Sequence, residues 1–274
     1  MAFHLPDWVR QVAADAREMI AEQFEYRELL YRMAQRDLLI RYKQTVLGFL
    51  WAIFMPLINT LIFSVIFTRV ARIDTHGIAY PVYAFCGLLA WNFFSSSLRF
   101  SVTSLTHNTS LVTKVYFPRE IFPFAAIWVG LVDFCVGSLV LAAFMAYYGV
   151  APHWTALALP LIVCVQMMFT AGIALLLAMA NLFYRDVKYL FEVTLTVWMF
   201  ATSVVYPVTL VKGRTGALLQ LNPMTPIIDA YRAVLLRGEL PGPAFGAAVV
   251  LSIVTFALGW LWFHRAEFTF AENI

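Results

Sequence analysis

Long apolar runs without a charge are the feature that most constrains this chain. Six of them have about the length of the ~20 residues that a helix needs to cross the ~30 Å hydrocarbon layer of a membrane. They lie at 46–67, 78–98, 121–148, 154–184, 193–211 and 244–263, and Asp133 is the one charged residue inside them. The sequence therefore predicts an all-α integral membrane protein with six transmembrane helices.

The composition supports the same class. Of the 274 residues, 62% are hydrophobic and 13% are charged, whereas a soluble domain has ~45–50% apolar and ~25% charged residues. This excludes a soluble globular protein, and it excludes a disordered chain, which needs the opposite composition. The three cysteines, Cys86, Cys135 and Cys164, lie in apolar runs without a CxxC spacing, which favours small buried side chains over a redox or metal site.

The placement of the charges predicts the orientation. Most of the 19 lysines and arginines lie before the first run or in every second connection after it. The positive-inside rule then places both termini in the cytoplasm. We expect a cytoplasmic region at 1–45, a transmembrane domain at 46–264 and a cytoplasmic tail at 265–274.

Two segments outside the spans have predicted roles: one forms a helix, and the other sets the direction of the span that follows it. In Phe24–Lys43, polar residues keep to one arc at helical spacing, and Glu28 and Arg32 stand four residues apart. This pattern is typical of an amphipathic helix on the membrane surface or of a helix packed on a partner, and both can hold. The connection Phe100–Glu120 ends at Pro118, which should stop a helix and direct the next span.

Lys212–Pro243 is too polar to span, yet it contains an apolar helix pattern. Thr225 is a candidate cap, Pro226 suits a first helical position and Gly238 suits the exit. We interpret the segment as re-entrant helices that dip into the outer leaflet before the last span. A plain extracellular loop with a surface helix is the alternative.

The chain lacks the usual signatures of catalysis. It has no GxxxxGK[ST] phosphate loop, its five histidines are dispersed, and no serine sits in a nucleophile elbow. We expect no catalytic residue, no metal site and no cofactor in this chain.

Asp133, near the middle of the third run, has two interpretations. An ionised Asp there costs at least ~2.5–3.5 kcal/mol unless it faces protein or water. A proton relay is one interpretation. An interhelical hydrogen-bonded layer is the other, and we favour it because a relay normally needs several ionisable groups.

Four sequence blocks resemble those of a known family. They are Arg36-Asp37-Leu38 with Arg41–Trp51 and Pro56, then Lys114–Glu120, Phe183–Tyr189, and Asn222–Ile227 with Tyr231-Arg232. In order and position, with six spans, they resemble the ABC-2-type exporter permeases, and within these the polysaccharide-export branch that handles O-antigen, capsule and teichoic acid.

The resemblance implies partners and roles. It implies a homodimer with the channel between the copies and two copies of a separate ATPase that binds ATP and Mg. The substrate would be a glycan on a polyprenyl lipid, carried across the inner membrane of a bacterium. The implied ATPase-coupling residues are Leu111, Val112, Thr113, Lys114, Val115, Tyr116, Phe117 and Arg119, with Glu28 and Arg32 on the interface helix. The implied channel residues are Tyr42, Trp51, Phe54, Trp198 and Tyr206, although lipid-facing packing is the alternative for each aromatic residue. The implied periplasmic gate residues are Asn222, Pro223, Pro226, Tyr231 and Arg232.

Other functions remain to be weighed against this one. An ABC-2 exporter of a small lipid or drug would share the fold. An ion-coupled secondary transporter or channel should show several intramembrane charges or an inverted repeat, and neither is evident. A membrane glycosyltransferase should show clustered acidic residues or metal ligands at a membrane face, and the sequence has no such cluster.

Overall fold

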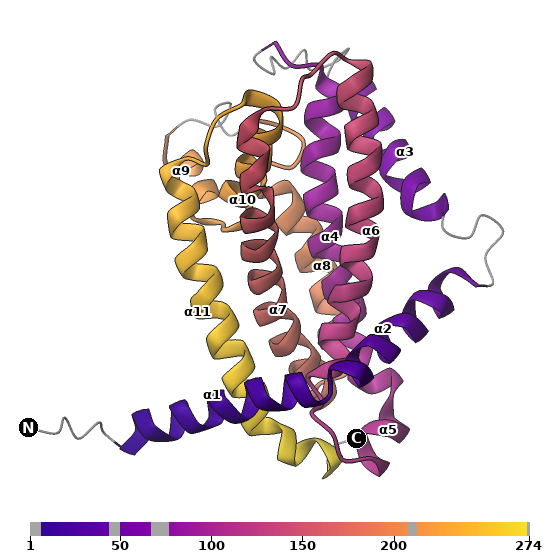
Figure 1. Cartoon of the computed structure of the whole chain (residues 1–274), viewed down its shortest axis with the longest axis vertical. Coiled ribbons are helices and arrows are strands. Elements are labelled where there is room, and N and C mark those ends of the chain that lie inside the picture. The colour runs from indigo at the N-terminus through magenta and orange to yellow at the C-terminus, as the bar shows by residue number, and fades with distance from the viewer. Residues whose placement is uncertain (1–6, 44–49, 67–76, 208–212, 273–274) are drawn as a thin grey trace, which may run out of the picture.

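The computed structural model describes residues 7–43, 50–66, 77–207 and 213–272, and these residues form helices and connections without a β-strand among them. Long helices stand side by side as a bundle, the first N-terminal helix runs across one end of it, and the second slopes upward from that end (Figure 1). The α-helices are α1 (Asp7–Glu25), α2 (Arg27–Tyr42), α3 (Trp51–Val65), α4 (Tyr80–His107), α5 (Thr109–Lys114), α6 (Ile121–Tyr147), α7 (Leu159–Phe183), α8 (Val187–Phe200), α9 (Gly213–Leu221), α10 (Met224–Arg232) and α11 (Pro243–Ala266). Shorter turns are the 3-10 helices η3 (Trp154–Ala158) and η6 (Glu267–Glu272) and the π-helical turn η5 (Ala233–Arg237).

Three helical stretches of the described residues are long and apolar enough to cross a membrane. They are Ile121–Tyr147, Trp154–Phe183 and Pro243–Ala266, and the mean hydropathy of each exceeds 2. They agree with the third, fourth and sixth expected runs to within three residues at either end. The apolar runs with charged borders therefore predict these helices well.

The other three runs differ from the helices that form. The second, expected at 78–98, continues as α4 to His107, and Arg99 on it pairs with Glu192 at 3.0 Å. The first contains α3, of 15 residues, and the fifth, expected at 193–211, overlaps α8, of 14 residues, which begins earlier, at Val187, and ends at Phe200. At 1.5 Å per residue these helices are about 21–22 Å long, shorter than the ~30 Å hydrocarbon layer. The expected start of the first run and the expected end of the fifth lie outside the described residues.

Helix α4 is the centre of the fold. It packs against α3, α6, α7, α8 and α10, and most of its side chains are buried. Phe94 illustrates this: its ring stacks on Phe169 of α7 and meets Trp198 of α8 edge-on, with centroids 5.7 and 5.1 Å apart. The outer helix α11 instead exposes large apolar side chains such as Val250 and Trp262, as expected of a surface that faces lipid.

Two glycines allow α7 and α11 to pack backbone to backbone. A Cβ on Gly172 would lie 2.5 Å from the carbonyl oxygen of Thr255, and a Cβ on Gly259 would lie 2.4 Å from that of Gly172. Small residues at such a crossing are the usual means by which membrane helices approach closely.

The N-terminal helices follow the amphipathic prediction in part. A turn at Tyr26 separates α1 from α2, and Met33 of α2 is buried against α6 and its neighbours. Figure 1 shows that α2 does not lie flat across the end of the bundle but rises beside α6 toward its middle. Its last residues, Arg41 and Tyr42, reach Asp133, which lies about 18 Å along α6 at 1.5 Å per residue. The Asp133 carboxylate, whose side chain is 22% exposed, accounts for this course, because a carboxylate in a largely apolar setting needs a partner.

Candidate functional site

The predicted coupling residues gather at the lower end of the bundle in Figure 1, here called the α5 end. Val112 points into the protein and is fully buried, whereas Thr113, Lys114, Val115 and Tyr116 are exposed, Tyr116 to 80%. The helix ends at Lys114, so Val115–Phe117 continue as an irregular segment, and Phe117 returns to the core with its ring 5.5 Å from that of Phe122. The segment thus presents one anchored face and one open face.

Arg119 joins this segment to the C-terminal turn. Its Nη2 and Nε donate to the carbonyl oxygen of Val112 at 3.2 and 3.4 Å. Its Nη1 donates to the backbone oxygen of Glu267 at 3.1 Å and lies 3.3 Å from the Glu267 carboxylate. The Arg119 backbone N–H donates to that same carboxylate at 2.9 Å. One side chain therefore holds the end of α5 and the start of η6 together.

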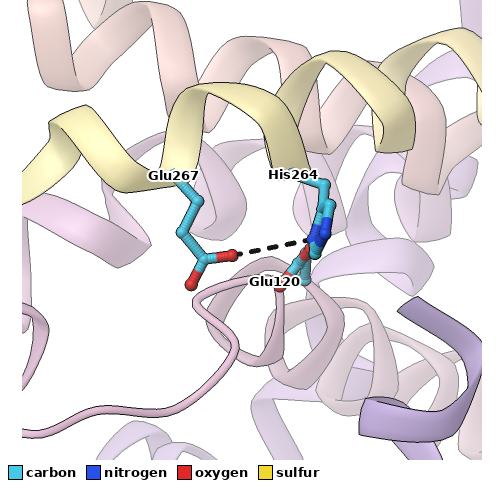
Figure 2. Close-up of side chains that lie close together, drawn as sticks. All are labelled: Glu120, His264 and Glu267. Carbon is cyan, nitrogen blue, oxygen red and sulfur yellow. Dashed lines mark hydrogen bonds and ion pairs between the residues drawn. The ribbon is translucent and has the colours of Figure 1, made fainter. Parts of the chain in front are cut away.

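Three ionisable side chains meet beside Arg119 (Figure 2). Nδ1 of His264 lies 3.1 Å from Oε1 of Glu120 and 4.0 Å from Oε2 of Glu267. Glu120 is only 1% exposed, and its second oxygen has no hydrogen-bond partner among the described residues. Burial raises the pKa of Glu267 to about 7, with Glu120 adding to the rise and Arg119 opposing it. Sequence reasoning missed this grouping, because 144 residues separate Glu120 from His264.

Glu28 and Arg32 lie on the outer face of α2. Their side chains form an exposed pair 3.6 Å apart. Nearby, α1 is tied to the end of α11 by Arg265 and Asp15 at 2.9 Å. The structure therefore brings both N-terminal helices to the α5 end, where polar side chains such as Glu28 and apolar side chains such as Phe24 are both exposed.

A groove lined by both polar and apolar side chains lies between α2, α3, α4 and α6, with a volume of about 570 Å³. Tyr42 and Trp51 line it, and Phe54 packs edge-on against Trp51 with ring centroids 5.8 Å apart. Arg41 forms an ion pair with Asp133 and lies 3.8 Å from the centroid of the Phe100 ring. The Tyr42 hydroxyl donates to Asp133 at 2.6 Å. Asp133 thus takes part in an interhelical hydrogen-bonded layer, as the favoured interpretation predicts.

The two other predicted channel residues lie elsewhere. Trp198 packs in the core against Phe94 and Phe169, and its indole N–H donates to Asn222 at 3.0 Å. The Tyr206 hydroxyl donates to the carbonyl oxygen of Phe200 at 2.8 Å. The structure therefore groups Tyr42, Trp51 and Phe54, but it does not bring Trp198 and Tyr206 to them.

The predicted gate residues gather around α10, at the end of the bundle here called the α10 end (Figure 1). Asn222 bridges the end of α8 and the start of α10, since it donates to the Ala201 carbonyl at 3.1 Å and accepts from the Met224 N–H at 3.1 Å. Pro223 and Pro226 shape the first turn, and the Tyr231 hydroxyl donates to Gln166 at 2.7 Å. Thr225 was expected to cap this helix and Pro226 to be its first residue, and both expectations are wrong: α10 begins at Met224 after an N-cap at Pro223. The Met224 N–H donates to the Asn222 side chain, one residue before the cap position. Gly238 does mark the exit, with φ of +71°.

Arg232 is the central side chain of this end. It is 1% exposed, and its guanidinium donates to the carbonyl oxygens of Ser203 at 2.7 Å, Val204 at 2.5 Å and Tyr83 at 3.4 Å. The Tyr83 ring lies 3.7 Å from the guanidinium carbon. These carbonyls belong in part to the irregular residues after α8, where no helical N–H reaches them. Arg232 therefore supplies the hydrogen bonds that allow α8 to end early.

The helical bundle, the apolar spans and the absence of a phosphate loop from the sequence define an integral membrane protein that has no nucleotide-binding motif of this kind. The chain belongs to the ABC-2 type transporter family, whose model matches residues 28–236. It is 31% identical over 260 residues to the O-antigen export system permease protein RfbA of Myxococcus xanthus, covering 93% of this chain and 99% of that protein. It is 27% identical to the RfbA permease of Klebsiella pneumoniae, over 89% of this chain and 94% of that protein. It is 22% identical to the polysialic acid transport protein KpsM of Escherichia coli, over 85% and 91%.

Proposed function

We propose that this chain is the membrane-spanning permease subunit of an ATP-driven exporter that moves a lipid-linked polysaccharide across the bacterial inner membrane. The observation that carries the proposal is the match to the Myxococcus xanthus permease over 99% of that protein's length. The absence of a phosphate loop agrees with an energy source on another polypeptide, because such a loop is the usual cradle for the phosphates of ATP. The chain itself then has no catalytic role.

The proposal includes an arrangement of subunits and an orientation. Two copies of the chain form the channel, and each binds one separate ATPase subunit that holds ATP and Mg. Each copy has six spans, both termini lie in the cytoplasm, and Lys212–Pro243 forms the re-entrant periplasmic gate. The open face of α5, with its exposed Lys114 and Tyr116, supports a docking role for the ATPase at the α5 end. The exposed pair Glu28–Arg32 adds a second polar contact there.

The groove between α2 and α6 is our candidate for the cytoplasmic start of the substrate path. Trp51 supplies an aromatic face, and Tyr42 supplies a hydroxyl beside it. Aromatic faces of this kind pack on the C–H faces of sugars. The predicted roles of Trp198, Tyr206 and the five gate residues stay part of the proposal. In one copy of the chain, Trp198 packs in the core and the Tyr206 hydroxyl bonds to the last residue of α8.

The test is export by the reconstituted complex. The chain is co-expressed with its cognate ATPase in a strain that lacks its own exporter and makes the lipid-linked glycan, and surface glycan is measured. We expect surface glycan only when both subunits are present and the ATPase can hydrolyse ATP. Export by the chain alone in liposomes, or transport of a small lipid or drug but no glycan, would contradict the proposal.

A further inference from the structure

Four side chains from two distant segments form a compact ionic group at the α5 end. We name Arg119, Glu120, His264 and Glu267 the C-terminal clasp (Figure 2). Arg119 and Glu120 immediately precede α6, whereas His264 lies at the end of α11 and Glu267 opens η6. All four side chains are 11% exposed or less. The clasp is therefore a buried contact between the connection after α5 and the last span.

The chemistry of the clasp resists separation of these two segments. It contains charges of both signs, and the Glu267 carboxylate accepts from both the backbone and the side chain of Arg119. Removing one partner of a buried ion pair leaves an uncompensated charge in an apolar setting, which is strongly unfavourable. A displacement of Arg119 is then expected to carry Glu267 and the end of α11 with it.

Each side of the clasp is fastened to a different part of the molecule. On one side, Arg119 holds the Val112 carbonyl of α5 at 3.2 Å. On the other side, α11 contacts α7 through Gly172 and Gly259, and Arg265 holds α1 through Asp15 at 2.9 Å. A force applied to the open face of α5 thus reaches α6 directly through the chain, and it reaches α11 and α1 through the clasp.

A bound cation is a less suitable explanation for the same group. The three candidate ligand atoms lie within 4.8 Å of one another. The Arg119 guanidinium, however, lies 3.3 Å from the Glu267 carboxylate and would repel a divalent ion beside it. The Arg119 guanidinium already pairs with the Glu267 carboxylate, and Nδ1 of His264 lies 3.1 Å from the Glu120 carboxylate.

We propose that the C-terminal clasp is a positioning device that transmits the movement of α5 to α11, so that Glu120, His264 and Glu267 set how much export each ATP hydrolysis yields. This inference rests on the proposed function. These residues act through α5 and not on the substrate. Their loss should therefore lower the export obtained per ATP hydrolysed more than it lowers the amount of the complex or its assembly.

The experiment measures glycan exported per ATP hydrolysed by the complete permease–ATPase complex. Glu267→Ala should lower this ratio by at least about fivefold, the lower end of typical coupling between sites. ATP hydrolysis and co-purification with the ATPase should stay within about twofold of the wild type, well below such coupling. Glu192→Ala is the matched control, because Glu192 also pairs with an arginine, Arg99 at 3.0 Å, but its side chain is half exposed on α8, outside the clasp and the gate segment. It should leave the ratio unchanged.

A second variant guards against a folding defect. Glu267→Gln keeps an acceptor for the Arg119 N–H but loses the charge, so it should give a ratio between those of the wild type and Glu267→Ala. If Glu267→Ala does not assemble, a wild-type ratio for Glu267→Gln overturns the inference. A wild-type ratio of glycan exported per ATP for Glu267→Ala in an assembled complex also overturns it. The inference is overturned as well if the wild-type complex holds one equivalent of zinc per permease chain and Glu267→Ala loses it, because the group would then be a metal site. If the wild-type complex exports no glycan, that result contradicts the proposed function and not the role of the clasp.

Discussion

The two ends of the bundle bury an arginine in different ways. At the α10 end, the partners described for Arg232 are backbone carbonyls and the Tyr83 ring. At the α5 end, Arg119 has both a carbonyl and a carboxylate as partners, and Glu120 and His264 stand beside them. At the α10 end, the arginine binds carbonyls of the irregular segment after α8. At the α5 end, side-chain pairs join two segments that lie far apart in the sequence. The difference teaches that a buried arginine can supply hydrogen bonds where a helix ends at one end of the bundle, and can join two segments far apart in sequence at the other.

The largest effect that this comparison predicts is at Arg232. Arg232→Met should leave the carbonyls of Ser203 and Val204 without the donors that Arg232 supplies, at about 1–3 kcal/mol for each unsatisfied group. We expect the assembled protein to be nearly absent from membranes, which immunoblotting and thermal unfolding in detergent can measure. Arg232→Lys should not rescue it, because one ammonium group cannot reproduce the planar fork. A stable Arg232→Met protein would show that the α10 end does not depend on the hydrogen bonds from Arg232.

Gly87 sharpens the same point with a smaller change. A Cβ at this position would lie 2.2 Å from the Val204 carbonyl oxygen and 2.4 Å from Nη2 of Arg232. Gly87→Ala should therefore destabilise the protein by about 1–3 kcal/mol, as overpacking typically does. Gly246→Ala in α11 is the control, because no atom lies within 4 Å of its added Cβ, and alanine favours a helix. Equal melting temperatures for the two variants would refute the packing argument.

Lys114→Pro tests the α5 end for function rather than stability. Proline removes a backbone donor from the six-residue helix α5 and clashes with the preceding turn. We expect export to fall by about tenfold, within the usual range of coupling between sites, while the protein still inserts and binds its ATPase. Surface glycan and co-purified ATPase are the two measurements. Normal export would count against α5 as the coupling element.

The smallest expected effect is a pH dependence confined to the α5 end. Because burial raises the pKa of Glu267 from 4.5 to about 7, its contribution to stability is complete below pH 4.5 and is lost as the pH rises through 7. The wild type should therefore lose stability relative to Glu267→Gln between pH 5 and pH 8, as measured by thermal unfolding of the solubilised protein. A difference that grows in favour of the wild type with rising pH would have the wrong sign.

The sequence predicts the long helices better than the short ones. Helices α6 and α11 follow from uncharged runs with charged borders, because hydrophobic length alone decides where such helices lie. The early end of α8 could not be predicted in this way, since it depends on hydrogen bonds from Arg232, which lies 28 residues beyond Val204. The local sequence pattern around α8 contains no information on the Arg232 guanidinium, because only the tertiary fold brings that donor to the end of α8.

The candidate site shows the same limit. The block Lys114–Glu120 directed attention to the α5 end, and the structure places an anchored, outward-facing segment there. The resemblance did not indicate that Glu120 meets His264 and Glu267, because those residues lie after the last apolar run. It also grouped Trp198 and Tyr206 with Trp51, although their described contacts lie in the core and near the end of α8.

The ion pair between Arg41 and Asp133 joins residues 92 positions apart. A ribosome makes the chain from its N-terminus, so Arg41 leaves the ribosome long before its partner does. During that interval α2 lacks the Asp133 carboxylate that holds its end beside α6, and its charged side chains favour the aqueous side of the membrane surface. The rise of α2 beside α6 is therefore expected to be a late event of biosynthesis, completed only after the third apolar run has entered the membrane.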